Sequence, residues 1–361
     1  MEKIKCGVLG ATGAVGQNYA LLLENHPWFE VSYLAASPNS AGKKYSEAVK
    51  GKWFMDKDIP KSLGNLIVGD ASKVQDALGK CKFVFSSYEG KKEDIQKTEM
   101  DYAKADIPVV SNNSAHRWTD DVPMIIPEIN ADHAKIIGIQ RKNRGFNKGF
   151  VVTKPNCSIQ SYLTPVYALM SKGYTPERII VSTEQALSGA GYPGVPSLAI
   201  LDNVIPYITG EAEKTEKEPM KVLGFLEKGK IQSYECNISA TCTRVNVKDG
   251  HLAMVNLGFA DKTPPSLEEI IGIWNNFKAE PQKLNLPSAP EHPIIYRTEE
   301  DRPQPRKDRD NDKGMAITVG RLRKCNALDI KFVGLSHNTI RGAAGGAILT
   351  AELLKAKDYI K

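Results

Sequence analysis

Cys157 lies in the stretch VVTKPNCSIQ (151–160), between a β-branched run and a segment with helical spacing. Only about 3% of a free thiol is ionised at pH 7, and the thiolate is the reactive form. The N-terminus of a helix stabilises a thiolate, and a nearby histidine can activate it. A lone cysteine in such a run is also typical of a buried structural thiol. Cys157 is therefore a candidate nucleophile that requires a second feature in its support.

The stretch GATGAVG (10–16) provides that second feature. Gly10, Gly13 and Gly16 stand three residues apart, directly between the first apolar strand and the first helical segment. Glycines at such a turn let the backbone approach a pyrophosphate at the helix N-terminus, where unpaired N–H groups point outward. The same glycines could serve close packing alone. Their position at the start of a strand–helix series favours a dinucleotide site.

The end of the second strand indicates which dinucleotide this is. A site for NAD usually presents Asp or Glu to the ribose 2′-hydroxyl about 20 residues past the glycine turn. This chain instead has AASPNSAGKK (35–44), with Ser37, Ser40, Lys43 and Lys44 and no acid. Hydroxyl and ammonium groups suit a 2′-phosphate. The sequence therefore favours NADP(H), while a solvated loop would have the same composition.

Strand and helix patterns alternate through the first third of the chain. The apolar strand-like runs are 5–10, 29–37, 82–87 and 107–112, and helical spacing covers 15–26 and 91–105. Such alternation predicts a parallel sheet that is covered on both faces. We expect an α/β fold in which residues 1–155 form an N-terminal Rossmann-type, doubly wound NADP-binding domain.

The rest of the chain has fewer helices between its strands. Strand-like runs cover 177–187, 236–247 and 251–260, one amphipathic helix covers 266–280, and a Pro- and charge-rich loop covers 301–314. We expect an α+β catalytic and dimerisation domain at 156–337. Residues 338–361 are expected to form a C-terminal helix, rich in small residues, that packs back on the first domain and completes it.

Composition narrows the class of protein. The 361 residues are 41% hydrophobic and 25% charged, as in an average soluble protein, and suffice for two domains. The net charge is +6, with scattered Lys and Arg, so nucleic acid is not the expected partner. No apolar stretch approaches the roughly 20 residues that span a bilayer, and the chain starts without a signal-peptide pattern. We expect a cytoplasmic protein without a membrane partner that acts on a small molecule.

The cysteine pattern argues against metal binding. The chain has six cysteines and no C-x-x-C pair. Cys236, Cys242 and His251 lack the tight spacing of a structural zinc site. Reduced thiols and no bound metal are therefore expected.

Six blocks of sequence together resemble the aspartate-β-semialdehyde dehydrogenase family. In order, they are GATGAVGQ (10–17), SNNSAHRW (111–118), PNCSIQ (155–160), EQALSGAG (184–191), RVNVKDGH (244–251) and SHNTIRGAAGGA (336–347). The stretch DRPQPRKDRD (301–310) is similar to the archaeal and fungal branch, which includes malonyl-CoA reductases. The resemblance implies NADPH-dependent reduction of L-aspartyl-4-phosphate to L-aspartate-4-semialdehyde through a cysteine thioester. It also implies a role in lysine, methionine and threonine biosynthesis, and a homodimer or homotetramer.

The resemblance assigns roles to individual residues. Cys157 is the implied nucleophile and His251 the implied general acid/base. Arg244 would bind the substrate α-carboxylate with its planar fork, and Glu218 would hold the ammonium group. The other implied substrate-binding residues are Arg117 and Lys221 for the phosphate, Gln185 for substrate orientation and Asn156 for the thioester carbonyl. If EPMK (218–221) is helical, Glu218 and Lys221 share one face, as an exposed ion pair also would.

The residues implied to bind NADP(H) come from the glycine turn, the ends of two strands, the SGAG run and the last helix. They are Gly10, Thr12, Gly13, Ala14, Val15, Gly16, Ser37, Ser40, Ser87, Ser188, Gly189 and Asn338.

Three alternatives use the same fold. A malonyl-CoA or other acyl-CoA reductase keeps the chemistry, but its substrate has no α-ammonium group for Glu218. An N-acetylglutamyl-phosphate reductase fits less well, because RVNVKDGH and Glu218 suit a free amino group. A non-catalytic NADP-binding regulator could have lost Cys157 or His251, and both are present.

Overall fold

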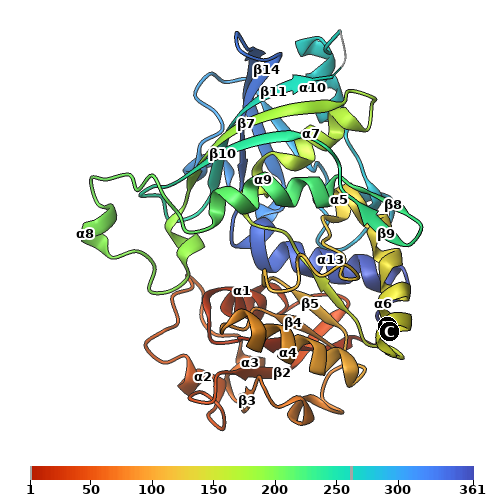
Figure 1. The fold of residues 1–361 in the computed structure, drawn as a ribbon. Helices are drawn as coiled ribbons and strands as arrows, with labels where there is room; N and C mark the ends of the chain where they lie inside the picture. Colours follow the sequence, from red (N-terminus) through yellow and green to blue (C-terminus); the bar gives the residue numbers. More distant parts are fainter. Residues whose placement is uncertain (1, 261–262) are drawn as a thin grey trace.

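The computed structural model describes residues 2–260 and 263–361. It contains two six-stranded sheets, one built from the N-terminal part of the chain and one from the C-terminal part (Figure 1). Helix α13 (Gly345–Ala356), near the end of the chain, lies between the two sheets. The functional residues predicted from the sequence lie close to this junction.

The first sheet is parallel throughout, with the strand order β3-β2-β1-β4-β5-β6. Its strands are β1 (Ile4–Leu9), β2 (Phe29–Ala36), β3 (Gly69–Asp70), β4 (Phe83–Ser86), β5 (Val109–Ser111) and β6 (Val151–Thr153). This is the order of a doubly wound dinucleotide-binding sheet, so the predicted Rossmann-type architecture is confirmed. Apolar residues fill successive positions of β1 and β4 because helices cover both faces.

The helices predicted for the first domain occur where the spacing placed them. They are α1 (Ala14–Leu22) after the glycine turn and α4 (Lys92–Lys104) before β5. Further helices are α2 (Tyr45–Ala48), α3 (Lys61–Gly64), α5 (Pro127–Asn130) and α6 (Ile136–Arg144). Strand β6 is the β-branched run that precedes Cys157 in the sequence. Strand β3 is too short to produce a periodic pattern, and the sequence did not reveal it.

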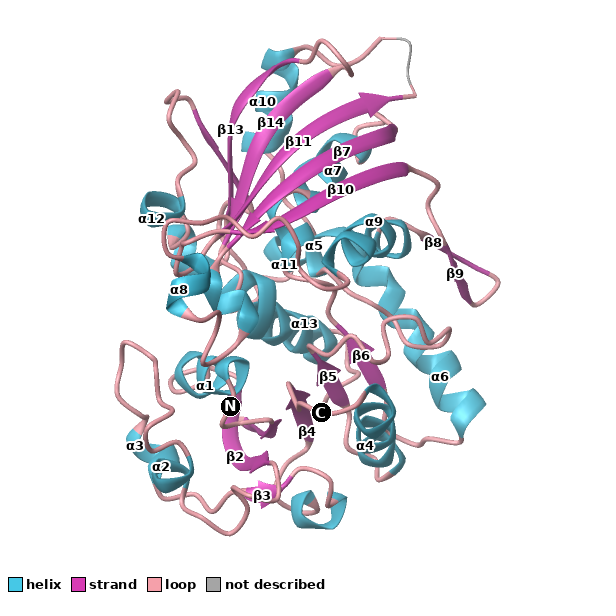
Figure 2. Ribbon diagram, turned by 60° about the vertical axis from the view of Figure 1, so that its left-hand side comes forward, coloured by secondary structure: helices cyan, strands magenta, loops and turns pink. Residues whose placement is uncertain are grey.

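The second sheet is mixed, with the strand order β10-β7-β11-β14-β13-β12. Its strands are β7 (Pro176–Gln185), β10 (Asn237–Arg244), β11 (His251–Phe259), β12 (Ile294–Arg297), β13 (Ile317–Lys324) and β14 (Ile330–Ser336). Side chains from one face pack with α7 (Leu163–Met170) and α10 (Leu267–Asn275) in a single apolar cluster. In Figure 2 both helices lie behind the strands, so the other face is open. Alternating burial along β10 and β11 agrees with this one-sided cover.

The remaining elements connect these layers. They are α8 (Ser197–Ile200), α9 (Glu211–Val222), α11 (Glu280–Lys283), α12 (Pro305–Asp308) and the hairpin of β8 (Phe225–Glu227) and β9 (Lys230–Gln232). Helix α12 lies within the stretch 301–314, which was expected to be a loop. None of the described helices is long and apolar enough to cross a membrane.

Two predicted helices have different starts. The segment after Cys157 begins with a four-residue 3-10 turn (Ser158–Ser161), and α7 begins only at Leu163. The segment after Asn338 begins with a π-helical turn (Ile340–Ala344) before α13. Gly342 lies in this second turn, and a Cβ there would lie 2.8 Å from Cys157 Cβ. The glycine therefore lets the π-helical turn approach the cysteine closely.

The C-terminal helix packs against the first domain, as predicted. Its apolar residues belong to the same buried cluster as β1, β2 and β4. Glu352 Oε1 lies 2.7 Å from His26 Nε2, and Ser288 donates its N–H and its hydroxyl to the same carboxylate. Both His26 and Glu352 are buried. This carboxylate joins three distant segments of the chain.

Replacing Glu352 by Leu tests the contribution of these hydrogen bonds to stability. The substitution leaves donors of His26 and Ser288 without an acceptor, and each such buried donor costs about 1–3 kcal/mol. We expect a loss of about 2–5 kcal/mol in the free energy of unfolding, measured by urea denaturation. Glu213→Leu, at an exposed position of α9, is the control and should stay within about 0.5 kcal/mol of the wild type. Equal stability of the two variants would contradict the structural role assigned to Glu352.

Candidate active site

Cys157 and His251 meet at the junction of the two sheets. Cys157 precedes the 3-10 turn that follows β6, and His251 is the first residue of β11. Cys157 Sγ lies 3.4 Å from His251 Nε2. The imidazole is fully buried, and the cysteine is half-buried. A half-buried thiol in contact with an imidazole has the arrangement of a nucleophile and its partner.

The opposite side of the imidazole contacts the chain just after β7. The Ala186 N–H donates to His251 Nδ1 over 3.0 Å, and Arg244 Nη1 donates to the Ala186 carbonyl over 2.6 Å. Strand pairing produces this arrangement, because Gln185 is paired with Arg244 of β10 and Glu184 with Leu252 of β11. A Cβ at Gly189 would lie 2.9 Å from Arg244 Nη1 and 3.1 Å from His251 Cε1. The SGAG run therefore packs directly on two of the predicted site residues.

Burial shifts the pKa values of Cys157, His251 and Lys154. It raises the pKa of Cys157 to about 11, helped by the negative charge of Glu211 and opposed by Lys154 and Arg117. It lowers the pKa of His251 to about 3, helped by the positive charge of Arg244 and by His337. It lowers the pKa of Lys154 to about 7. Imidazolium is therefore strongly disfavoured in this environment.

Lys154 is a candidate site residue that the sequence analysis did not single out. It is buried, and its ammonium group donates to the Pro155 carbonyl over 2.7 Å. Its positive charge acts on Cys157 and lowers the pKa of that thiol. A lysine three residues before a cysteine is a common pattern, so only its burial beside the thiol distinguishes it.

The loop that carries Cys157 is held by Glu218. The Asn156 N–H donates to Glu218 Oε2 over 2.6 Å, and Arg117 Nη1 donates to Oε1 over 2.8 Å. Asn156 Oδ1 accepts from the N–H and hydroxyl of Ser158. Asn156 Nδ2 has no hydrogen-bond partner within the described ranges, so it can donate to a substrate oxygen. The carboxylate and the amide together fix the backbone on both sides of the thiol.

The predicted phosphate ligands already have protein partners. Lys221 Nζ donates to the carbonyls of Arg117, Thr119 and Val122 at 2.6–3.3 Å. Arg117 also donates to the carbonyls of Lys154 and Asn112. A phosphate at Lys221 would have to replace one of these bonds. Glu218 and Lys221 do lie one turn apart on α9, but they are buried rather than an exposed pair.

The other predicted substrate residues lie at the ends of neighbouring strands. Gln185, the last residue of β7, donates to Thr183 Oγ1 over 3.2 Å, and its side chain is buried. Among the residues that the structure describes, Arg244 Nε and Nη2 have no partner. The N–H bonds of these two nitrogens are parallel and form the fork that can bind a carboxylate. The predicted carboxylate site therefore has donors to offer.

A cavity of about 370 Å³ contains most of the predicted cofactor residues. Those that line it are Gly10, Thr12, Gly13, Ala14, Ser37, Ser40 and Ser87. Val15 and Gly16 are not in the lining. Gly16 instead permits close packing, since a Cβ there would lie 2.2 Å from the Gly10 carbonyl oxygen. The glycine turn thus serves both close packing and a cavity.

The chemistry of this cavity fits NADP(H). Helix α1 begins beside it without a side-chain cap and without an acid in its first turn, so its N-terminal N–H groups suit a phosphate. A Cβ at Gly13 would meet nothing closer than 3.5 Å, and the backbone there is open to a ligand. Lys52 also lines the cavity, whereas Lys43 and Lys44 do not. The sequence analysis missed Lys52 because it lies outside the expected spacing.

Ser188 lines a second cavity that adjoins the cofactor cavity, whereas Gly189 and Asn338 line neither of the two. A cavity of about 710 Å³ includes Ser188 and shares Ala14, Tyr192 and Pro193 with the cofactor cavity. Asn338 Nδ2 donates to Ser188 Oγ, and Asn338 Oδ1 accepts from the Gly250 N–H. Asn338 therefore ties the SGAG run to the residue before His251. A nicotinamide contact of its side chain stays a prediction.

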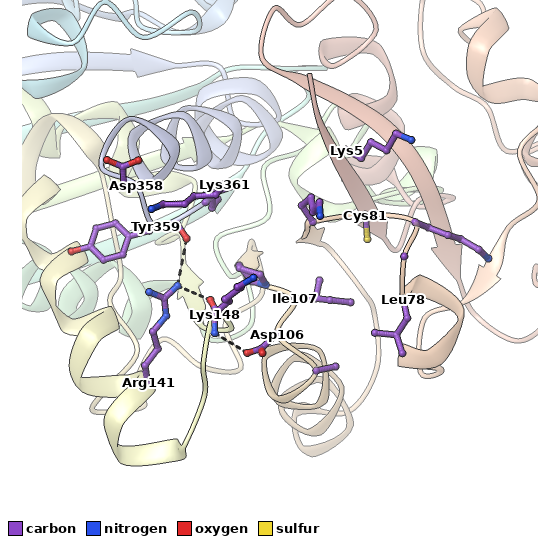
Figure 3. Close-up of a pocket in the computed structure, with 16 residues that line it drawn as sticks. Lys5, Leu78, Cys81, Asp106, Ile107, Arg141, Lys148, Asp358, Tyr359 and Lys361 are labelled. Carbon is purple, nitrogen blue, oxygen red and sulfur yellow. Dashed lines mark hydrogen bonds between the residues drawn. The ribbon is translucent and has the colours of Figure 1, made fainter. Parts of the chain in front are cut away.

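A third cavity, of about 540 Å³, lies at the opposite end of the parallel strands (Figure 3). It includes Lys5 at the start of β1, and Arg141 Nη2 donates to the Lys148 and Tyr359 carbonyls. Asp106 Oδ1 caps the N–H groups of residues 147–149 there. None of the predicted site residues lines it. Ligands of such sheets bind at the carboxyl ends of the strands, so we assign this cavity no part in the reaction.

Comparisons with known proteins match two family models to separate parts of the chain. Residues 5–137 match the family model described as "Semialdehyde dehydrogenase, NAD binding domain", and residues 166–341 match "Semialdehyde dehydrogenase, dimerisation domain". The chain is 46% identical to an aspartate-semialdehyde dehydrogenase of Aspergillus fumigatus, over 99% of both chains. It is 44% identical to one of Methanothermobacter thermautotrophicus, over 97% of this chain and 99% of the other.

A solved structure extends this similarity to three dimensions. An aspartate semialdehyde dehydrogenase of Candida albicans, solved with NADP, has a TM-score of 0.90. It is 37% identical in sequence, and the match covers 99% of this chain and 100% of the other. A Vibrio cholerae structure with a TM-score of 0.75 is only 23% identical and supports the fold alone.

Replacing Lys52 by Ala tests the cofactor cavity. If the ammonium group contacts a 2′-phosphate, its loss removes a charge-assisted hydrogen bond worth about 1.5–3 kcal/mol. We expect KM for NADPH to rise about tenfold or more and KM for NADH to change little, measured by steady-state kinetics. Lys50→Ala, at a neighbouring exposed position, is the control. An equal effect of Lys52→Ala on both cofactors would contradict the assignment.

Proposed function

This chain belongs to the semialdehyde dehydrogenase family and acts as an NADP-dependent aspartate-semialdehyde dehydrogenase, and we propose that Cys157 and His251 carry out its reaction. The reaction is the reductive dephosphorylation of L-aspartyl-4-phosphate to L-aspartate-4-semialdehyde, and its reverse. The 3.4 Å contact between Cys157 Sγ and His251 Nε2, beside the glycine-turn cavity, is the observation that carries this proposal.

The proposed mechanism begins at the sulfur. The Cys157 thiolate attacks the acyl carbon, the carbon–oxygen bond to phosphate breaks, and phosphate leaves with the bonding electrons, so that a thioester forms. Bound NADPH supplies the hydride that reduces this thioester. The aldehyde is released when the carbon–sulfur bond breaks and the thiolate is restored. Half-burial of the thiol supports this role, because it keeps the thioester away from bulk water while substrate can reach it.

The proposed substrate contacts follow from the available donors. Arg244 offers Nε and Nη2 to the α-carboxylate, and Asn156 Nδ2 can donate to the acyl oxygen. Arg117 and Lys221 are proposed for the phosphate and Glu218 for the ammonium group, each by exchanging one of its present bonds. Gln185 is proposed to orient the acyl group beside the thiol. The surplus of cations around Cys157 supports an anionic substrate.

The reaction is tested in the reverse direction. With L-aspartate-4-semialdehyde and NADP, we expect reduction of NADP that requires inorganic phosphate and that Cys157→Ser abolishes, while binding of NADPH is kept. The loss should be at least about 10⁴-fold, as for the removal of other catalytic nucleophiles. Turnover that requires coenzyme A in place of phosphate would indicate an acyl-CoA reductase. Substantial turnover of Cys157→Ser would contradict the assigned nucleophile.

We further propose that a second copy of the chain covers the open face of the second sheet. Ile180 on that face is 46% exposed, and Leu252, Met254 and Val333 are half-buried beside it. A second apolar surface lies on the segment around α8, where Leu198 is 90% exposed. The family model that matches this region is described as a dimerisation domain. Together these surfaces favour a homodimer, which could pair again as a tetramer.

Introducing negative charge on the open face of the second sheet tests this interface. The double substitution Ile180→Glu and Met254→Glu places two carboxylates on adjacent strands, at side chains that do not enter the core. We expect the wild type to sediment as a dimer or tetramer and the variant as a monomer with unchanged circular dichroism. Ile67→Glu, which is exposed in the first domain, is the control. An unchanged sedimentation coefficient of the double variant would rule out this face as the interface.

A cytoplasmic location is also part of the proposal. All six cysteines are free, and three of them are buried. Free thiols are typical of reducing compartments. The small polar substrates and NADP are compatible with such a compartment.

A further inference from the structure

The third cavity, at the amino ends of the parallel strands, carries a surplus of positive charge. Its lining includes two carboxylate side chains, Asp106 and Asp358, and six cationic side chains: Lys5, Lys80, Lys82, Arg141, Lys148 and Lys361. The surplus remains with an α-carboxylate at Lys361 counted as well. Among the residues that the structure describes, none of these lysines has an ion-pair partner. Unpaired ammonium groups that share a cavity repel one another and attract an anion.

The floor of the third cavity is apolar. Cys81, before β4, and Ile107, before β5, line the cavity and are buried. Leu78 also lines it and is 45% exposed. Figure 3 shows Leu78 and Lys5 across the cavity from Arg141. Cations around an apolar surface are the composition of a site for an organic anion.

The fold holds the guanidinium group of Arg141 in a fixed orientation. Its Nη2 donates to the carbonyls of Lys148 and Tyr359, and its Nε donates to the Gly149 carbonyl over 3.4 Å. These acceptors carry no net charge. Burial lowers the pKa of Arg141, and Tyr359 and Asp106 offset this effect only in part. Nη1 has no hydrogen-bond partner in the part of the chain that the structure describes, so an oriented donor is available to an anion.

The carboxylate of Asp106 is bonded to the backbone. Its Oδ1 accepts from the N–H groups of residues 147–149 at 2.7–3.1 Å. These hydrogen bonds, the one from Lys148 above all, lower the pKa of Asp106. Asp106 therefore fixes the loop that carries Lys148, and it forms no ion pair within the described ranges. Asp358 is exposed and is likewise without an ion-pair partner there.

We propose that the third cavity is a binding site for a small molecule that carries a di- or triphosphate group. Arg141 Nη1 donates to a phosphate oxygen, and the lysines of the lining neutralise the remaining charge. The organic part of the ligand lies on the floor formed by Cys81 and Ile107. Each phosphate group brings up to two negative charges and several acceptor oxygens. A surplus of three or four positive charges therefore matches two or three phosphate groups better than a single carboxylate.

The size and the place of the cavity limit what it can bind. Its volume of about 540 Å³ falls within the range of small-molecule sites, which is about 300–1,000 Å³. A nucleic acid or a protein partner would need a much broader surface. The cavity lies at the end of the sheet away from the glycine turn, so the ligand is distinct from the substrate and the cofactor. The proposal is therefore independent of the proposed function.

Calorimetric titration of the full-length protein tests the site. Inorganic tripolyphosphate is the probe, with EDTA present and with NADPH at saturation so that the cofactor cavity is filled. We expect one equivalent to bind with a Kd below about 1 mM at 0.15 M salt. The affinity should fall as salt is added, because exposed charges are screened. No binding at millimolar tripolyphosphate would overturn the proposal.

A second titration with ATP, under the same conditions, tests the apolar floor. ATP has the same triphosphate group and adds an organic part. We expect ATP to bind at least about threefold more tightly than tripolyphosphate, because its organic part buries apolar surface. Equal or weaker binding of ATP would contradict the assigned floor.

Substitution of exposed lysines locates the bound probe. The test variant combines three changes in the cavity: Lys5→Ala, Lys82→Ala and Lys148→Ala. The control variant makes the same change of charge at three exposed lysines elsewhere: Lys217→Ala, Lys230→Ala and Lys324→Ala. An exposed charge pair changes binding by about 1.5- to 5-fold, so the test variant should bind about tenfold more weakly or worse. Equal affinities of the two variants would place the probe outside the cavity and overturn the proposal.

The substitution Arg141→Lys separates a directed donor from a diffuse charge. Lysine keeps the charge but cannot hold a donor in the position of Nη1 while it bonds the same carbonyls. We expect tripolyphosphate to bind at least about fivefold more weakly, with unchanged circular dichroism and unchanged kcat. Unaltered affinity of Arg141→Lys would contradict the role assigned to the guanidinium group.

Discussion

Two glycines permit the close packing around Cys157 and His251, and a third shapes the cofactor cavity. Gly342 lets the π-helical turn lie against Cys157, and Gly189 lets the SGAG run lie against His251 and Arg244. Gly10 turns with φ +81°, where a Cβ would come within 2.3 Å of the Ser87 carbonyl oxygen. These contacts bring the cofactor cavity, the sulfur and the imidazole to one junction.

Buried charges hold the cysteine loop at this junction. Arg117, Glu218 and Lys221 are all buried and bonded to each other or to backbone carbonyls. Removing such charges from water is costly, and an apolar replacement of similar shape is often as stable. These charged groups orient the backbone around the thiol. Glu218 fixes the N–H of the residue before Cys157, and Lys221 fixes the chain around Arg117. The same groups that position the nucleophile are therefore those proposed to meet the charged ends of the substrate.

The sequence predicted the structure best where a repeating pattern or a fixed spacing of residues determines it. The parallel sheet, the glycine turn and the strand-like runs at 177–187 and 251–260 follow from apolar periodicity. The Cys157–His251 pair came from the family resemblance, since 94 residues separate the two. The two-residue strand β3, the 3-10 start after Cys157 and the partners of Lys221 arise from tertiary packing, which leaves no local pattern. The sequence did not predict Lys52 and Lys154 as site residues for the same reason. Each is one lysine among many, and only its surroundings in the folded protein distinguish it.

The central claim is that the sulfur of Cys157 becomes acylated during the reaction. The most direct measurement incubates the enzyme with L-aspartate-4-semialdehyde and NADP without phosphate, quenches it in acid and maps the peptides by mass spectrometry. The account predicts an aspartyl thioester on the peptide that contains Cys157, which disappears when phosphate is added before the quench. An acyl group on another residue, or no acyl group in an enzyme that turns over with phosphate, would contradict it.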